Sequence, residues 1–304
     1  MRSLIPLAAT IVLSFTSLTA KPQTADRIVL NVTVTTDKGA AITDLTRENF
    51  SVNIDKRPQE ILSFNSDVSA SIGILIDTSE SLAKRGQKLK QNLKAGLERF
   101  LQLGQPANEY FVMSFNSDIA IVQDWTNQPV SVTNKLDSLE YKGQTSLYDA
   151  ISKAMSKVSE GRNSKHVLLL FSDGSDTYSR AMFKDVRETL KRSDVVLYAV
   201  GVIDTSSHQM APVIAAEGMA VLEEYASNSG GRTSFSDDPS KPAAFTKALE
   251  SFAVELRSHY QLVIRAEEPT GKEKWRKLSV TVTRNNSSGK PQKLIVRTRK
   301  GYYR

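Results

Sequence analysis

Three short segments carry hydroxyl and carboxylate side chains at spacings that suit a metal ion. The first is Asp77-Thr78-Ser79-Glu80-Ser81, in which a carboxylate is followed by two hydroxyls at two-residue intervals. Two more candidates lie downstream, Thr145 in Gly143-Gln144-Thr145-Ser146 and Asp173 in Phe171-Ser172-Asp173-Gly174. Hard cations such as Mg2+ bind oxygen ligands and keep some of their water. The candidate ligands of one ion are therefore Asp77, Ser79, Ser81, Thr145 and Asp173.

The segments before these residues are typical of buried parallel strands. Residues 71–76 and 167–171 are continuous apolar runs, and apolar residues at helical spacing follow the first of them. Strand and helix patterns alternate from there to about residue 256, which predicts a doubly wound, mostly parallel sheet with helices on both faces. In such sheets ligands bind at the carboxyl ends of the strands. Asp77 and Asp173 both lie at that edge.

The five positions resemble the metal-ion-dependent adhesion site of the von Willebrand factor type A family. The family pattern places Asp-x-Ser-x-Ser after the first strand, a Thr in a second loop and an Asp in a third. The resemblance covers about residues 70–256, with a small departure at Ser172, where members often carry Thr. On the residues alone, the alternative is that the Ser and Asp side chains merely cap helices. Glu80 and Asp176 also lie near the site in the sequence. We expect them to act as acids at helix N-termini, and the alternative is that they tune the charge of the site.

The resemblance implies binding chemistry. Ser79 and Ser81 would coordinate Mg2+ or Mn2+ directly through their hydroxyls. Asp77 and Asp173 would supply charge, in part through bound water. Thr145 would join when a ligand arrives. A protein partner would fill the open position with the carboxylate of an Asp or a Glu, so we expect a non-enzymatic binding protein.

The sequence contains no recognisable catalytic motif. A serine-protease triad requires a His, and the three in the chain, His166, His208 and His259, stand in no such motif. Phosphoryl transfer through Asp77 would need a second Asp two residues later, where the chain has Ser79. The chain has no Gly-x-x-x-x-Gly-Lys phosphate loop. It has no Cys, which excludes disulfides, thiol catalysis and zinc-thiolate sites.

The first twenty residues differ from the rest of the chain. Arg2, an apolar run that extends to Leu18 and the small residues Thr19-Ala20 predict a secretory signal peptide over residues 1–20. An uncleaved membrane anchor is the alternative. Since no other segment is long and apolar enough to span a bilayer, we expect no transmembrane span in the mature chain. We expect an exported protein in the periplasm, at the cell surface or in the medium.

Strand patterns flank the central domain on both sides. Residues 21–69 and 257–304 each predict about three strands, which is too few for an independent sheet pair. We therefore predict one six-stranded β-sandwich built from both segments, with the domain of residues 70–256 inserted into it. Two separate β appendages are the alternative. The Arg-Lys-Gly-Tyr sequence at 299–302 resembles the ending of bacterial secreted proteins of the von Willebrand A-related type.

The last segment is strongly basic. The chain has a net charge of +7, and residues 257–304 hold thirteen Lys and Arg against three Glu. Basic faces attract anionic polymers, so the alternative function is a basic β module that binds anionic envelope polymer, with a structural metal site. Because we expect export, we expect no nucleic-acid partner. We expect Arg297, Arg299 and Lys300 to be exposed cations that mainly affect the rate of association.

Overall fold

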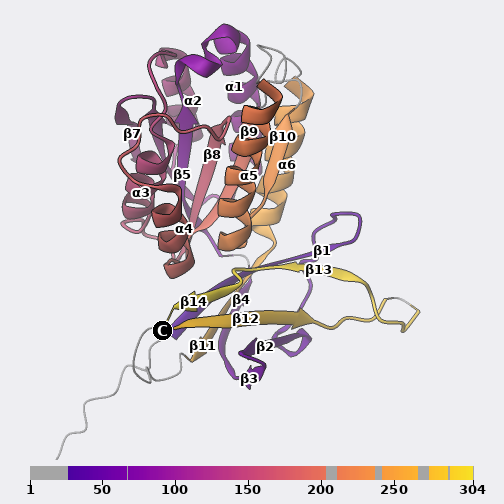
Figure 1. Ribbon diagram of the computed structural model, residues 1–304. Helices are drawn as coiled ribbons and strands as arrows, with labels where there is room; N and C mark the ends of the chain where they lie inside the picture. The colour runs from indigo at the N-terminus through magenta and orange to yellow at the C-terminus, as the bar shows by residue number, and fades with distance from the viewer. Residues whose placement is uncertain are drawn as a thin grey trace, which may run out of the picture.

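The structure is a computed structural model that describes residues 27–66, 68–202, 211–236, 242–265, 274–286 and 288–303. The predicted signal peptide and His208 lie outside the described residues. The chain forms an α/β domain and a β-sandwich, which lie one above the other in Figure 1. The predicted fold class, a doubly wound sheet flanked by a β-sandwich, is confirmed. None of the helices among the described residues combines the length and hydrophobicity of a membrane span.

The α/β domain is built on a six-stranded sheet of order β10-β9-β8-β5-β6-β7. Its strands are β5 (Ala70–Asp77), β6 (Glu109–Phe115), β7 (Ile119–Thr126), β8 (Lys165–Ser172), β9 (Val196–Val202) and β10 (Thr233–Ser236). β7 pairs antiparallel with β6, whereas the other pairs are parallel. Every residue of β5 is buried, as its continuous apolar run predicts.

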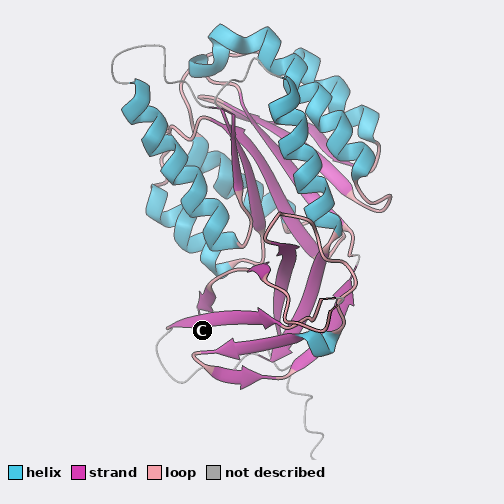
Figure 2. Cartoon of the chain, turned by 90° about the vertical axis from the view of Figure 1, so that its right-hand side faces the viewer, coloured by secondary structure: helices cyan, strands magenta, loops and turns pink. Residues whose placement is uncertain are grey.

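Helices cover both faces of this sheet, as Figure 2 shows. One face carries α1 (Gly86–Leu103), α2 (Pro129–Asn134) and α6 (Pro242–Arg257), and the other carries α3 (Leu147–Val158), α4 (Phe183–Arg192) and α5 (Ala211–Ser229). The 3-10 helices are η1 (Arg47–Asn49), η2 (Glu80–Arg85) and η3 (Lys135–Ser138). Apolar residues at helical spacing, such as Leu89, Leu93 and Leu97, are buried against the sheet, which explains why this segment forms a helix at the sheet surface.

The β-sandwich combines strands from both ends of the described chain. Its sheets have the orders β13-β1-β11-β4 and β14-β12-β2-β3. The N-terminal strands are β1 (Arg27–Thr36), β2 (Phe50–Ile54), β3 (Arg57–Gln59) and β4 (Ile61–Ser66), and the C-terminal strands are β11 (His259–Arg265), β12 (Trp275–Val282), β13 (Leu294–Arg297) and β14 (Gly301–Tyr303). The prediction of six strands is wrong, since eight are described. β3 and β14 have three residues each, too few to show an alternating pattern.

β1 shows how closely the two chain ends depend on each other. It lies antiparallel between two C-terminal strands, with Ile28 opposite Ile264 of β11 and Val34 opposite Val296 of β13. Its alternate side chains are buried in one apolar cluster with residues of the second sheet, among them Phe50. The arrangement supports one joint sandwich over two separate appendages.

A buried polar cluster joins the sandwich to the α/β domain. The carboxylate of Glu255, on α6, accepts hydrogen bonds from Nε of Arg232 at 2.7 Å and from Nη2 of Arg297 at 2.8 Å. The hydroxyl of Tyr198 lies 2.9 Å from Oε1 of Glu255 and 2.8 Å from Nε2 of His259. Since Arg297 ends β13 and His259 begins β11, both sandwich strands are held to the domain through this cluster.

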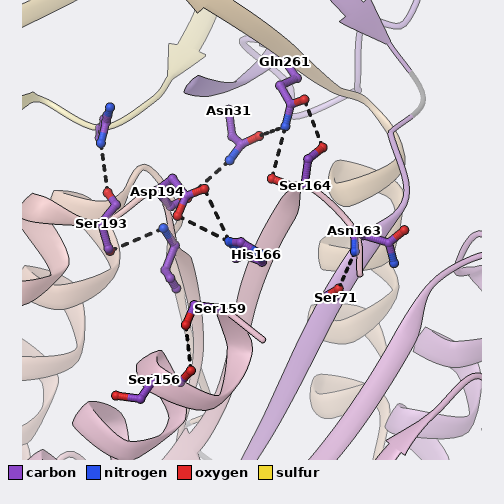
Figure 3. A network of polar contacts seen from close by, with 12 residues as sticks. Asn31, Ser71, Ser156, Ser159, Asn163, Ser164, His166, Ser193, Asp194 and Gln261 are labelled. Carbon is purple, nitrogen blue, oxygen red and sulfur yellow. Dashed lines mark hydrogen bonds and ion pairs between the residues drawn. The ribbon is translucent and has the colours of Figure 1, made fainter. Parts of the chain in front are cut away.

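Asp194, between α4 and β9, makes a second polar junction (Figure 3). Its carboxylate lies 3.4 Å from Nδ1 of His166, and its carbonyl accepts a hydrogen bond from the Asn31 side chain at 3.3 Å. Beside it, Arg299 donates to the carbonyl of Ser193 at 2.9 Å. Strand β1 and the C-terminal segment are thereby held to the same end of the α/β sheet.

The expectation that Arg297 and Arg299 are exposed surface cations is wrong. Arg297 pairs with Glu255 in the buried cluster, and burial lowers the pKa of Arg299. The sequence pattern predicts the strand near these arginines. It does not predict their partners, Glu255 on α6 and Ser193 before β9. Lys300 is exposed, as expected. Part of the basic charge of the last segment therefore serves contacts within the molecule.

We expect acid to weaken this junction through His259. Burial, together with Lys165 and Arg297, holds the pKa of His259 well below its usual range, and among the described residues its buried Nδ1 has no hydrogen-bond partner. The unfolded chain takes up a proton at a pKa of about 6.5 that the folded protein resists. The free energy of unfolding should therefore fall below about pH 6.5, by up to about 1.4 kcal/mol per pH unit.

Urea denaturation of the wild type and of His259→Gln, from about pH 7.5 to about pH 5, measures this effect. Because the other titrating groups are present in both proteins, the difference between the two free energies isolates His259. As the pH falls, we expect the free energy of unfolding of the wild type to decrease relative to that of His259→Gln. A difference that stays constant over the range would contradict the prediction.

Candidate functional site

The structure brings the predicted ligands to one edge of the α/β sheet. Asp77 is the last residue of β5, and Asp173 follows β8 directly. These two strands are parallel neighbours, so the loops that leave them lie side by side. Ser79 and Ser81 belong to the loop and 3-10 turn that follow β5.

Hydrogen bonds connect four of the predicted ligands in series. The Ser81 hydroxyl donates to Oδ2 of Asp173 at 2.7 Å, and it lies 3.0 Å from the hydroxyl of Ser79. The backbone N–H of Ser79 donates to Oδ1 of Asp77 at 2.9 Å. Two carboxylates and two hydroxyls from loops about a hundred residues apart in the chain thus meet, as their spacing after parallel strands predicts.

Thr145 is held at the same edge through its own segment. The backbone N–H of Glu80 donates to the carbonyl of Gly143 at 3.0 Å, and that of Lys142 donates to the carbonyl of Thr78 at 2.8 Å. Thr145 is 3% exposed. Within the described part of the chain its hydroxyl forms no hydrogen bond to the other four predicted ligands, so its place beside them is set by the backbone.

Ser172 is a site residue whose role the sequence did not reveal. Its hydroxyl donates to Oδ2 of Asp77 at 2.7 Å and accepts from the N–H of Gly174 at 3.0 Å. With Ser79 on the other oxygen, both oxygens of the Asp77 carboxylate are oriented. The available signal was the position of a polar residue at the buried end of β8, next to the end of β5.

The electrostatics of the site favour a cation. Burial, and then the nearby carboxylate of Asp173, raise the pKa of Asp77 to about 7, while hydrogen bonds from Ser79 and Ser172 act in the opposite direction. Asp77 is 1% exposed, and a buried carboxylate beside a second one is unfavourable unless positive charge offsets it. The groups present therefore fit an added cation.

The donor set also limits the type of ion. Among the described residues, no three His, Cys, Asp or Glu side chains gather to hold a metal. The site instead offers two carboxylates and neutral hydroxyls, all of them oxygen donors. Oxygen donors suit hard ions such as Mg2+ and Mn2+ better than soft ones.

The two neighbouring acids, Asp176 and Glu80, lie at the N-termini of helical segments. The carboxylate of Asp176 accepts a hydrogen bond from the N–H of Tyr148 at 3.1 Å, in the first turn of α3. This confirms the prediction that it acts as an acid at a helix N-terminus. Glu80 is exposed at the first residue of η2, also at a helical N-terminus.

The two described histidines lie at the other end of the sheet. His166 is the second residue of β8 and contacts Asp194. His259 contacts Tyr198, near the start of β9. Because the strands run in parallel, these positions are at the opposite edge from Asp77, where a triad with its neighbours would need an imidazole.

Residues 72–175 match the family model of the von Willebrand factor type A domain, a range that includes all five predicted ligands. The fold is similar to the vWF domain of the type V pili tip protein Mfa5 from Porphyromonas gingivalis, with a TM-score of 0.50, 11% identity and coverage of 68% of this chain and 99% of that one. It is also similar to proximal thread matrix protein 1 from the mussel byssus, in a structure whose MIDAS motif is occupied by zinc. The TM-score is 0.50, the identity is 16%, and the match covers 63% of this chain and 50% of that one.

A third similar structure is a von Willebrand factor type A protein from Catenulispora acidiphila, with a TM-score of 0.49, 11% identity and coverage of 83% of this chain and 73% of that one. A search among curated proteins gives no match. This chain spans half the length of the mussel protein, and at these identities the structural similarities concern the fold alone. The family match lies on the strands and loops that build the site. Residues 72–175, at the centre of the α/β domain, are therefore similar in sequence to the von Willebrand factor type A domain.

Proposed function

We propose that the chain is an exported, non-enzymatic binding protein that captures an acidic side chain of a protein partner at a metal-ion-dependent adhesion site. The observation that carries the proposal is the buried, oriented carboxylate of Asp77, which is joined to Asp173 through the backbone N–H of Ser79 and then the hydroxyls of Ser79 and Ser81. The residues that would hold Mg2+ or Mn2+ are Asp77, Ser79, Ser81, Thr145 and Asp173.

The ion would supply an electrophilic centre for an incoming carboxylate. Three of the five proposed ligands are neutral hydroxyls, which leave much of the positive charge of a divalent ion uncompensated. Ser81 is exposed and Asp173 is partly exposed, so the group of ligands is open to solvent on that side. An Asp or Glu of a partner could approach from there.

Relatives of similar fold support binding and export. They include a pilus tip protein and a matrix protein of the mussel byssus. The mussel structure has zinc in its MIDAS motif. For this chain we propose Mg2+ or Mn2+ on the strength of its oxygen-only donors, and a location in the periplasm, at the cell surface or outside the cell.

The proposal includes a division of the chain. Residues 1–20 would be the signal peptide, 70–256 the von Willebrand factor type A domain, and 21–69 and 257–304 the two β segments that complete one sandwich. The pairing of β1 with β11 and β13 supports the joint sandwich. The sandwich would carry the metal site at the far end of the inserted domain.

Capture of a partner from the envelope of the source cells tests the function. With Mg2+ present, we expect the wild type to retain a protein that a chelator releases, and we expect Asp77→Ala to retain none. Moderate salt should reduce this capture only slightly, because coordination at a partly dehydrated ion is less screened than exposed charges, for which the screening length is about 8 Å at physiological ionic strength.

The alternative, a basic β module that binds anionic envelope polymer, makes the opposite prediction. Capture that survives the chelator but disappears in moderate salt would reject the adhesion site as the function. The junction contacts weigh against this alternative, because they engage Arg297 and Arg299 inside the molecule.

A further inference from the structure

The loop between β8 and α4, residues 173–182, has a fixed backbone although it contains no regular structure. Eight of its nine backbone N–H groups from 174 to 182 donate hydrogen bonds, and they belong to residues 174, 175, 177, 178, 179, 180, 181 and 182. Two of them, from Thr177 and Tyr178, reach the carbonyl of Thr145 at 2.9 Å each. The loop is therefore built onto a proposed metal ligand.

Contacts with α3 and α5 hold the rest of the loop. The carboxylate of Asp149 accepts the N–H groups of Arg180 at 3.0 Å and of Ala181 at 2.9 Å. Gly174, at φ +83°, lies against Gly218 of α5, and a Cβ atom at Gly174 would come within 2.2 Å of the Gly218 carbonyl oxygen. The loop is thus fixed at its start, middle and end.

This rigid loop presents large side chains to solvent. Tyr178 and Met182 are each 56% exposed. Arg180 and Lys184, the second residue of α4, are also exposed, and within the described residues neither forms an ion pair. Tyr, Met and Arg are enriched in protein interfaces, and a surface that is ordered beforehand loses less conformational entropy when a partner binds.

We propose that Tyr178, Arg180, Met182 and Lys184, which we call the ridge, bind an extended acidic segment of the partner protein. The inference rests on the proposed function, since the same segment would give its first carboxylate to the ion. Continuity supports this occupant, because the ridge begins at the backbone that holds Thr145. Charge supports it too: Arg180 and Lys184 are free to pair with a second acidic residue, while Tyr178 and Met182 offer apolar contact to a residue beside it.

A peptide array tests the ridge. The reference probe is a seven-residue peptide of Ser with a central Asp. In each of the other peptides, one Ser is replaced by Leu, Phe, Glu or Lys, and every Ser position is tested in turn. Binding of the full-length protein is measured with Mg2+ and with chelator. In the wild type, we expect an apolar residue and a Glu on one side of the central Asp each to increase affinity about tenfold, and we expect Lys there to decrease it.

Variants separate the ridge from the ion. Tyr178→Ser should remove the gain from Leu and Phe, and the double variant Arg180→Gln, Lys184→Gln should remove the gain from Glu. Both should bind Mg2+ and the reference peptide as the wild type does. The matched controls Ile295→Ser and Lys290→Gln, exposed positions on the sandwich, should change none of these values.

The outcomes distinguish the two proposals. If the wild type binds the reference peptide in a chelator-sensitive way but shows no side-chain preference, or if the ridge variants keep that preference, the ridge is rejected and the adhesion site stands. If no peptide binds, or if binding ignores the chelator, the proposed function fails together with the inference that rests on it.

Discussion

Replacing Asp77 by Ala should abolish the binding of Mg2+ and Mn2+, whereas replacing an exposed carboxylate should not. Asp77 is the buried charge at the centre of the site, and Ser79 and Ser172 orient both of its oxygens. Titration calorimetry on the wild type, Asp77→Ala and the control Asp137→Ala measures the effect. We expect one site in the wild type and the control, and an affinity at least about a hundredfold lower in Asp77→Ala. Equal binding by all three would refute the site.

The same variant should keep its fold in the absence of a metal ion. Removing the carboxylate leaves the Ser172 hydroxyl and the backbone N–H of Ser79 without their acceptors, and each loss costs about 1–3 kcal/mol. It also removes the unfavourable burial of a charge beside Asp173, which acts in the opposite direction. We therefore expect urea denaturation without added metal to show a net change within about 2 kcal/mol.

The pH dependence of metal binding follows from the raised pKa of Asp77. Without the ion this carboxyl is half protonated at about pH 7, and a metal ligand must be deprotonated. The affinity should therefore fall as the pH decreases below about 7, by up to about tenfold per pH unit. Calorimetry in buffers of different ionisation enthalpy would detect the released proton. This dependence has the opposite sign from the effect of Asp77 on stability without metal, because a raised carboxyl pKa favours the folded state as the pH falls.

The sequence was sufficient for the parts of the molecule that depend on local pattern. The apolar run before Asp77 and the helical spacing after it predict a buried strand and a helix, and alternation of such units predicts the doubly wound sheet. The order of β5 and β8 in that sheet then brings their carboxyl ends together. The proximity of Asp77 and Asp173 follows from topology, without any knowledge of side-chain contacts.

Contacts through space could not be predicted in this way. In the sequence pattern of β13, Arg297 occupies a position that would suit any solvent-facing residue. Nothing near it in the chain indicates its partner, Glu255 on α6. Ser172 is one more hydroxyl near a strand end until β5 is placed beside β8. The β8–α4 loop shows neither a helical nor a strand period, so its fixed backbone becomes visible only with the bonds to Thr145 and Asp149.

Deleting residues 258–304 should unfold the N-terminal strands while the α/β domain stays folded. β1 would lose both of its neighbours, β11 and β13, and β2 would lose β12 and keep only the short β3. Two strands without a covering sheet are rarely stable. Hydrogen exchange over Ile28–Phe64 should speed up by about a thousandfold or more, whereas amides of β5 and β8, which lie between two apolar clusters of their own, should keep their protection.

A shorter deletion supplies the matched control. Removing residues 300–304 takes away β14, an edge strand of three residues that pairs with β12, and leaves Arg297 and Arg299 in place. Since β1 keeps both neighbours in that variant, its amides should stay protected, and only β12 should exchange faster. Unchanged protection of Ile28–Phe64 after the long deletion would mean that the N-terminal strands fold alone. The two chain ends would then be separate β units, and the α/β domain would lie between them without being inserted into one sandwich.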